Sequence, residues 1–194
     1  MLQTPCVLFA GGRSSRMGTD KSLLPFGGFE TLAEFQYVRL SKIFSHIYIS
    51  CKDKSKFPFN AEFIEDSKIS NTYAPTLGFI SAFESLGESF FALSVDSPFV
   101  DEEIIKKLLK MDRKNDDATV AKTIEGIEPL CGVYHPSLHL HFQKMLMKKQ
   151  HKLGLLLKNS KTQFINFKEK EKFLNLNHPY EYKKALRIIN STLL

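Results

Sequence analysis

Short apolar runs alternate with longer segments of helical periodicity along the chain. Several of the runs are rich in β-branched or aromatic residues, and together they predict strands at residues 6–10, 46–51, 61–64, 90–95, 118–122, 131–134 and 163–167. Helical patterns lie between them at residues 30–44, 77–86, 101–111, 137–149 and 180–189. This alternation predicts an α/β fold, a three-layer α/β/α sandwich on a mostly parallel, Rossmann-like sheet.

The size of the chain fits one hydrophobic core. Its 194 residues are 43% hydrophobic and 25% charged, which is the composition of an ordinary globular domain. No internal repeat, low-complexity tract or dividing linker interrupts the pattern, and the polar stretch 112–117 is a short connection. We therefore predict a single domain over residues 1–194.

The chain is basic, with 27 Lys and Arg against 21 Asp and Glu and a net charge of +6. Such an excess favours an anionic ligand. The basic residues are spread along the chain rather than clustered, and the 17 phenylalanines suit core packing. We expect a phosphate-bearing small molecule as the ligand and no nucleic acid.

Cysteine usage and hydropathy indicate the cellular compartment. Cys6, Cys51 and Cys131 are too far apart for a Cys-x-x-Cys pair and too few for a disulfide framework. We see neither a secretory leader nor an apolar stretch of membrane-spanning length, so we expect a cytoplasmic protein with no membrane association. His135 and its neighbours His139 and His141 have no acidic or thiol partner at metal-binding spacing, so we expect no metal there.

A glycine-rich, cationic segment, FAGGRSSRMGTDK, follows the first predicted strand at residues 9–21. In open α/β sheets this first strand-to-helix connection lies at the carboxyl edge, where ligands bind. Glycines let backbone amides approach phosphate oxygens, and Arg13, Arg16 and Lys21 add cationic donors. The segment predicts a polyanion site, although its spacing fits neither the Walker nor the Rossmann phosphate motif.

The pattern A-G-G-x-S-x-R-M-G-x-D-K at residues 10–21 resembles the signature loop of the MobA-like nucleotidyltransferases, in particular their guanine-nucleotide branch. Three further blocks follow in family order. They are I-E-D at 64–66 with A-P-T-L-G at 74–78, V-D-S-P at 95–98, and F-L-N-L-N-H-P at 173–179. The resemblance therefore spans nearly the whole chain.

The resemblance implies a reaction in which the phosphate of molybdopterin attacks the α-phosphate of GTP and pyrophosphate leaves. It implies Mg²⁺ as cofactor, and as further partners the proteins that synthesise the cofactor or deliver it to molybdoenzymes. Asp96 ends a predicted strand at the same edge as the glycine-rich segment, which suits a Mg²⁺ ligand; the alternative is a turn or N-cap aspartate. Lys21 and Arg16 are the candidate cations for the leaving phosphates. Asp20 either orients Lys21 or caps the following segment.

The same resemblance implies the residues that contact the nucleotide. They are Phe9, Ala10, Gly11, Gly12, Lys21, Ser50, Asp66, Gly78 and Asp96. Asp66 matches the position at the nucleoside end of GTP, with a loop cap as the alternative, and Ser50 stands where relatives often have Asn. In the family, Ala-Gly-Gly in the first loop accompanies guanine, which favours GTP over CTP. Ala74, Thr76 and Leu77 depart from the family pattern near the expected base pocket.

The acceptor side has fewer sequence signals. Asn175 and Asn177 are two residues apart on a predicted extended segment and would face the same way, where they would contact the acceptor or support the metal. An Asx turn before the last helix is the alternative. His151 and Lys152 stand where relatives have arginines on the acceptor side. Two other functions stay open: a nucleotidyltransferase that uses CTP or a sugar phosphate, and a nucleotide-binding protein without turnover.

Overall fold

The computed structural model describes residues 1–11, 18–66 and 75–192. Its strands are β1 (Cys6–Phe9), β2 (Ile47–Cys51), β3 (Glu62–Glu65), β4 (Phe90–Ser94), β5 (Ala118–Lys122), β6 (Ile127–Tyr134) and β7 (Thr162–Asn166). Its α-helices are α1 (Leu32–Leu40), α2 (Pro75–Leu86), α3 (Glu102–Met111), α4 (His139–Met147), α5 (Leu153–Lys158) and α6 (Pro179–Thr192). Short 3₁₀ helices lie at Lys21–Leu23, Lys54–Lys56, Pro136–Leu138 and Lys170–Phe173.

All seven strands form one sheet in the order β3-β2-β1-β4-β6-β5-β7. Only β6 runs antiparallel to its neighbours among these strands, so the predicted mostly parallel sheet is confirmed. Phe9 at the end of β1 pairs in register with Ser50 of β2 and Ser94 of β4. The carboxyl ends of three parallel strands therefore meet at one edge of the sheet.

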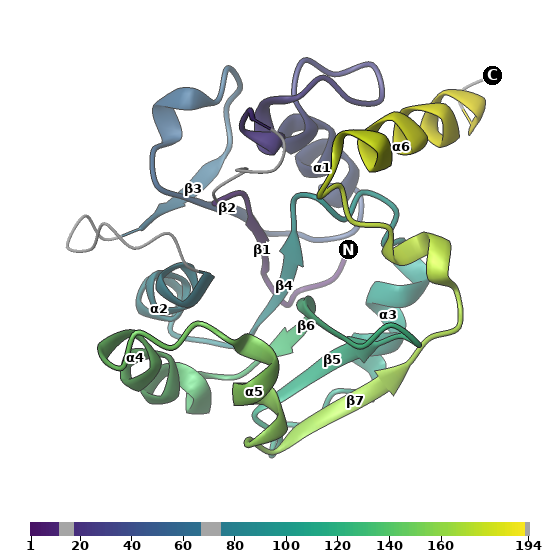
Figure 1. The fold of residues 1–194 in the computed structure, drawn as a ribbon. Coiled ribbons are helices and arrows are strands. Elements are labelled where there is room, and N and C mark those ends of the chain that lie inside the picture. The colour runs from purple at the N-terminus through teal and green to yellow at the C-terminus, as the bar shows by residue number, and fades with distance from the viewer. Residues whose placement is uncertain (12–17, 67–74, 193–194) are drawn as a thin grey trace.

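Helices cover both faces of the sheet, which confirms the three predicted layers (Figure 1). Cys6 and Leu8 of β1 face the layer formed by α1, α3 and α6, and both are fully buried there. Val7 and Phe9 face α2, α4 and α5 on the other side. Because each central strand is buried on both faces, its sequence is apolar without alternation, which is typical of parallel sheets.

The observed elements differ from the predicted ones mainly in three places. Helix α1 ends at Leu40, four residues before the predicted end at residue 44, because the chain continues as a hydrogen-bonded turn. Strand β6 begins at Ile127, four residues before the predicted start at residue 131, because pairing with β5 resumes at Glu128 and Ile127 beyond a register shift. Helix α5 was not predicted, since six residues give too little periodicity to recognise. Among the described residues, no helix has the length and apolarity needed to cross a bilayer.

Gly132 of β6 lies where the pairing of β5 with β6 shifts register after Val120. A Cβ at this position would lie 2.4 Å from the Thr119 carbonyl oxygen and 2.7 Å from the Val120 Cα. Only a residue without a side chain fits there, because the neighbouring atoms belong to backbone that cannot turn away.

We expect Gly132→Ala to lower the free energy of unfolding by about 2–3 kcal/mol through overpacking. Gly154→Ala in α5 is the control, since a Cβ there meets no atom within 4 Å. That variant should unfold at the wild-type denaturant concentration or slightly above it. Urea denaturation followed by circular dichroism measures both, and equal midpoints for the two variants would contradict the packing argument.

Candidate active site

Lys21 and Asp96 meet at the carboxyl edge of the sheet. Lys21 is the last residue of the glycine-rich segment and the first residue of a 3₁₀ helix. Its ammonium group forms an ion pair with the Asp96 carboxylate. The same ammonium donates a 3.0 Å hydrogen bond to Oδ1 of Asn177, in the segment before α6. The Lys21 and Asp96 side chains are only 17% and 15% exposed. Three segments far apart in sequence are therefore joined in a partly desolvated site.

Asp96 follows β4 in a turn but does not cap a helix. Its Oδ1 accepts a 2.6 Å hydrogen bond from the Ser94 hydroxyl, and its backbone carbonyl accepts from the Leu176 amide at 2.9 Å. The N-cap of α3 is Asp101, whose carboxylate accepts from Ile104. The alternative of Asp96 as a helix cap is therefore excluded, and its carboxylate is directed toward Lys21.

Asp20 has one of its two predicted roles, that of a cap. Its Oδ1 accepts from the Ser22 backbone amide at 3.0 Å, which caps the 3₁₀ helix that begins at Lys21. Its other oxygen, Oδ2, accepts from the Lys56 ammonium at 2.6 Å. Asp20 therefore caps the helix and pairs with Lys56, whereas Asp96 and Asn177 orient Lys21.

Two cavities open on either side of Asp96. The smaller, of about 150 Å³, is lined by Phe9, Ala10, Gly11, Asp20, Lys21, Ser22, Ser94, Val95, Asp96 and Leu130. The larger, of about 350 Å³, is lined by residues that include Ser97, Glu128, His151, Leu153, Phe173, Asn175 and Asn177. Ser94, Asp96 and Leu130 line both. Asp96 therefore lies where the two cavities meet.

Asp66 lies beside Gly11, which lines the smaller cavity. A Cβ on Gly11 would be 4.0 Å from Oδ2 of Asp66. Burial raises the pKa of the Asp66 carboxyl to about 6, an effect that the nearby Lys52 only partly offsets. Its Oδ1 is buried without a hydrogen-bond partner in the described part of the chain. A ligand with N–H groups would satisfy this atom. The residues that a loop cap would bond, 67–74, lie outside the described part of the chain, so the loop-cap alternative stays open.

Three predicted nucleotide-binding residues pack on one another. Ser50 is 2% exposed and Phe9 is buried. A Cβ on Gly78 would lie 2.8 Å from the Ser50 hydroxyl and 3.0 Å from the Phe9 ring. Gly78 thus lets α2 approach the ends of β1 and β2, and neither it nor Ser50 lines the two cavities. Gly12, Arg16 and Ala74 lie outside the described residues.

Asn175 and Asn177 both line the larger cavity, as the sequence predicts. Asn175 accepts from the Ser97 hydroxyl at 2.5 Å and also hydrogen-bonds Glu128. Glu181 in the first turn of α6 accepts hydrogen bonds from the backbone N–H groups of Asn177 and His178, the two residues before the helix. Neither asparagine side chain is needed for a turn before α6.

Glu128 was missed by the sequence analysis. Glu128 lines the larger cavity with Asp96. Burial raises the pKa of the Glu128 carboxyl, and hydrogen bonds from Asn175 and Thr123 only partly offset this effect. The available signal was a single carboxylate beside Pro129 within an otherwise apolar strand, which strand periodicity does not distinguish from a solvent-facing residue.

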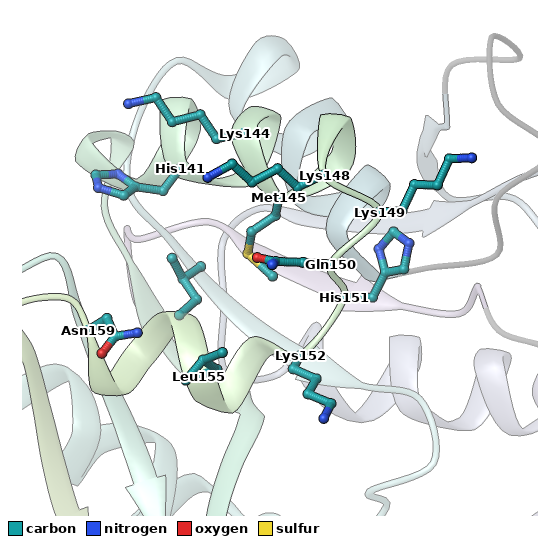
Figure 2. A pocket seen from close by; sticks show the side chains of 11 residues that line it. His141, Lys144, Met145, Lys148, Lys149, Gln150, His151, Lys152, Leu155 and Asn159 are labelled. Carbon is teal, nitrogen blue, oxygen red and sulfur yellow. The ribbon is translucent and has the colours of Figure 1, made fainter.

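A basic groove of about 580 Å³ lies between α4 and α5 (Figure 2). Met145 and Gln150 point into it, whereas Lys149 and Lys152 extend away from its rim. The described residues that line it are His141, Lys144, Met145, Lys148, Lys149, Gln150, His151, Lys152, Leu155, Leu156 and Asn159, and none of these is acidic. His151 also lines the larger cavity, so the groove adjoins the site at the position predicted for acceptor contacts.

The side chains around Asp96 fit a divalent cation of the Mg²⁺ type. Ser94, Ser97, Glu128, Asn175 and Asn177 bring hydroxyl, carboxylate and amide oxygens to the same cavity, and oxygen is the ligand that Mg²⁺ prefers. No group of three His, Cys, Asp or Glu side chains with metal-binding geometry occurs among the residues that the structure describes. Such a sparse set suits Mg²⁺, which usually keeps waters and takes substrate phosphate oxygens.

Known proteins resemble this chain over nearly its full length. The molybdenum cofactor guanylyltransferase of Campylobacter jejuni is 41% identical over 180 residues, which is 92% of this chain and 93% of that protein. The enzyme of the same name from Helicobacter pylori is 35% identical over 191 residues, covering 95% and 92% of the two chains.

A solved structure and a family model match this chain as well. The crystal structure of molybdopterin-guanine dinucleotide biosynthesis protein A from Archaeoglobus fulgidus superposes with a TM-score of 0.83 at 22% identity, covering 97% of this chain and all of that one. The family model for the MobA-like NTP transferase domain matches residues 6–163. This chain therefore belongs to the MobA-like NTP transferase family.

Proposed function

We propose that this chain is a molybdenum cofactor guanylyltransferase, which transfers GMP from GTP to the terminal phosphate of molybdopterin. An oxygen of the acceptor phosphate forms the new bond to the α-phosphorus, and the bond to the bridging β-phosphate oxygen breaks. The products are pyrophosphate and molybdopterin guanine dinucleotide. The observation that supports this most strongly is the Lys21–Asp96 pair at the junction of two cavities.

The junction supports an in-line arrangement of the two substrates. GTP in the smaller cavity would place its triphosphate along Gly11 and Lys21, and molybdopterin in the larger cavity would approach Asp96 from the other side. Nucleotidyl transfer asks mainly for such alignment and for neutralisation of charge that develops on the leaving pyrophosphate. Lys21 is the described cation that supplies this charge, and Arg16 is its proposed companion from outside the described residues.

We also propose Mg²⁺ as the cofactor, held on the protein side by Asp96 with Asn177 and Glu128 close by. Bound Mg²⁺ supplies Lewis-acid stabilisation of phosphate oxygens. The chain's own contribution is to hold the Asp96 carboxylate, since Ser94 donates to one oxygen and Lys21 to the other. We place the reaction in the cytoplasm, and we propose that the proteins that make or deliver the cofactor are its partners.

We propose that Asp66 recognises the guanine base by hydrogen bonds. Guanine offers an N1–H and an exocyclic N2–H₂ on one edge, and a carboxylate accepts from both. The buried Oδ1 of Asp66, which has no partner among the described residues and lies near Gly11, supports this assignment. Cytosine and adenine do not present that pair of donors, so GTP should be preferred.

Product analysis tests the proposed function directly. Purified protein is incubated with Mg²⁺, molybdopterin and one of GTP, CTP or ATP, and the products are identified by mass spectrometry. We expect the guanine dinucleotide with GTP, and GTP should bind at least about tenfold more tightly than CTP in calorimetry, because a missed carboxylate contact costs 1.5–3 kcal/mol. Equal or better binding and turnover with CTP would assign the chain to the cytidylyltransferase alternative.

The raised pKa of Asp66 predicts a pH dependence of base recognition. With a pKa of about 6, the carboxyl is protonated below that pH and then no longer accepts both guanine donors. GTP affinity should therefore fall by about tenfold as the pH drops from 7.5 to 5, because a charge-assisted contact is lost. Asp66→Asn should bind GTP weakly at both pH values.

ATP affinity measured over the same pH range is the control, since its triphosphate titrates like that of GTP and its base does not present the two donors. If GTP and ATP lose affinity in parallel, or if Asp66→Asn keeps the full pH dependence, Asp66 does not read the base.

Substitution of Asp96 separates a metal role from a structural one. Asp96→Asn keeps the shape and most hydrogen bonds but removes the charge that a divalent cation needs. We expect turnover to fall by about a hundredfold or more, because several kcal/mol of charge stabilisation depend on the bound cation. The melting temperature should stay within a few degrees of wild type.

GTP affinity of Asp96→Asn is measured in excess Mg²⁺ and in excess EDTA. Affinity in EDTA should be no weaker than wild type, whereas the gain on adding Mg²⁺ should shrink. A variant with wild-type turnover, or one that gains as much GTP affinity from Mg²⁺ as the wild type does, would remove Asp96 from the proposed metal site.

A further inference from the structure

Lys56 contacts both ends of the glycine-rich segment. It is the last residue of the 3₁₀ helix Lys54–Lys56, in the connection from β2 to β3. Its ammonium group donates to the Ala10 carbonyl at 3.3 Å, to Asp20 Oδ2 at 2.6 Å and to the Ser22 hydroxyl at 3.3 Å. Ala10 is the second residue of the segment and Asp20 is the last but one. One side chain from a different connection therefore contacts the segment near both of its ends.

The contact between Lys56 and Asp20 also neutralises a carboxylate beside the smaller cavity. Asp20 lines the smaller cavity together with Lys21, so its carboxylate faces the space proposed for a triphosphate. An uncompensated carboxylate there would repel the ligand, and the repulsion would be stronger than in water because the surroundings are partly desolvated. Burial raises the Asp20 pKa, but hydrogen bonds from Lys56 and Ser22 outweigh it and lower the pKa overall, so Asp20 stays charged.

Lys56 is built into this position rather than lying on the surface. Its side chain is 23% exposed, and its ammonium lies 4.8 Å from the centre of the Phe57 ring. Lys54, two residues earlier in the same short helix, is 61% exposed and pairs with Glu65 on the outside. The two lysines therefore differ in what they contact while sharing a backbone element.

We propose that Lys56 is a positioning residue for nucleoside triphosphate binding, which holds the two ends of the glycine-rich segment together and neutralises Asp20. It does not line the cavity, so it acts through Ala10 and Asp20. The inference rests on the proposed function, because it takes the ligand of the smaller cavity to be a nucleoside triphosphate. It adds a residue from the β2–β3 connection that the motif blocks of the sequence do not include.

The first experiment compares Lys56→Met with Lys54→Met in the full chain. GTP dissociation constants are measured by calorimetry in Mg²⁺, and KM and kcat are measured with molybdopterin. Lys56→Met should weaken GTP binding by about tenfold, the value of one charge-assisted contact, with KM for GTP raised and kcat changed much less. Lys54→Met should bind as the wild type does, and Lys56→Arg should recover much of the affinity.

The second experiment tests charge compensation through Asp20. Asp20→Asn keeps an amide oxygen that can still cap the Lys21–Leu23 helix, but it removes the negative charge. The double variant Asp20→Asn/Lys56→Met should therefore bind GTP more tightly than Lys56→Met alone, and Asp20→Asn alone should bind at least as tightly as wild type. This double-mutant cycle isolates the coupling of the two side chains.

Two results would overturn the proposal: Lys56→Met with wild-type GTP affinity, whatever its melting temperature, and a double variant that binds no better than Lys56→Met. If the wild-type protein binds GTP and either result occurs, Lys56 does not position the site as proposed. If the wild-type protein binds no nucleoside triphosphate, the proposed function itself fails, and the assignment of Lys56 fails with it.

Discussion

The Lys21–Asp96 ion pair is the interaction on which the arrangement of the site depends. It joins the connection after β1 to the turn after β4, and the hydrogen bond from Lys21 to Asn177 adds the segment before α6. Part-buried pairs of this kind are not strong evidence for stability, because desolvation of both charges offsets their attraction. Their value here is geometric, since a cation and a carboxylate are fixed at the junction of two cavities before any ligand binds.

The parallel sheet brings these parts together. Phe9, Ser50 and Ser94 end neighbouring strands in register, so the loops that follow them share one edge. The antiparallel strand β6 then brings its own beginning to that edge, which is how Glu128 reaches the larger cavity. Gly78 lets α2 pack closely behind this edge, because any side chain there would collide with Ser50. Strand pairing and the close contact of α2 thus fix the positions of the segments that carry the site residues.

Carboxylates in a site for polyanions repel the ligand, and the four described here fall into two groups. Asp96 is paired with Lys21, and Asp20 is paired with Lys56. Burial raises the pKa of Asp66 to about 6, so its charge is lost only in mildly acidic solution. Burial likewise raises the pKa of Glu128, which Asn175 helps to hold in place. Two lysines therefore neutralise carboxylates inside the site, while the net positive charge of the whole chain favours an anionic ligand.

The sequence by itself determined the layered α/β fold, the seven strands and the location of the glycine-rich segment, because strand periodicity, apolar runs and glycine spacing are local properties. It also indicated Lys21, Asp96 and Asn177 as site residues through motifs that stand in order along the chain. Only the tertiary structure decided which of these side chains touch. The partner of Asp20 is Lys56, 36 residues away, and the carboxylate facing Asp96 comes from an antiparallel strand. Such pairings depend on strand order and direction, which no local pattern encodes, so Lys56, Glu128 and the basic groove between α4 and α5 became visible only in the folded chain.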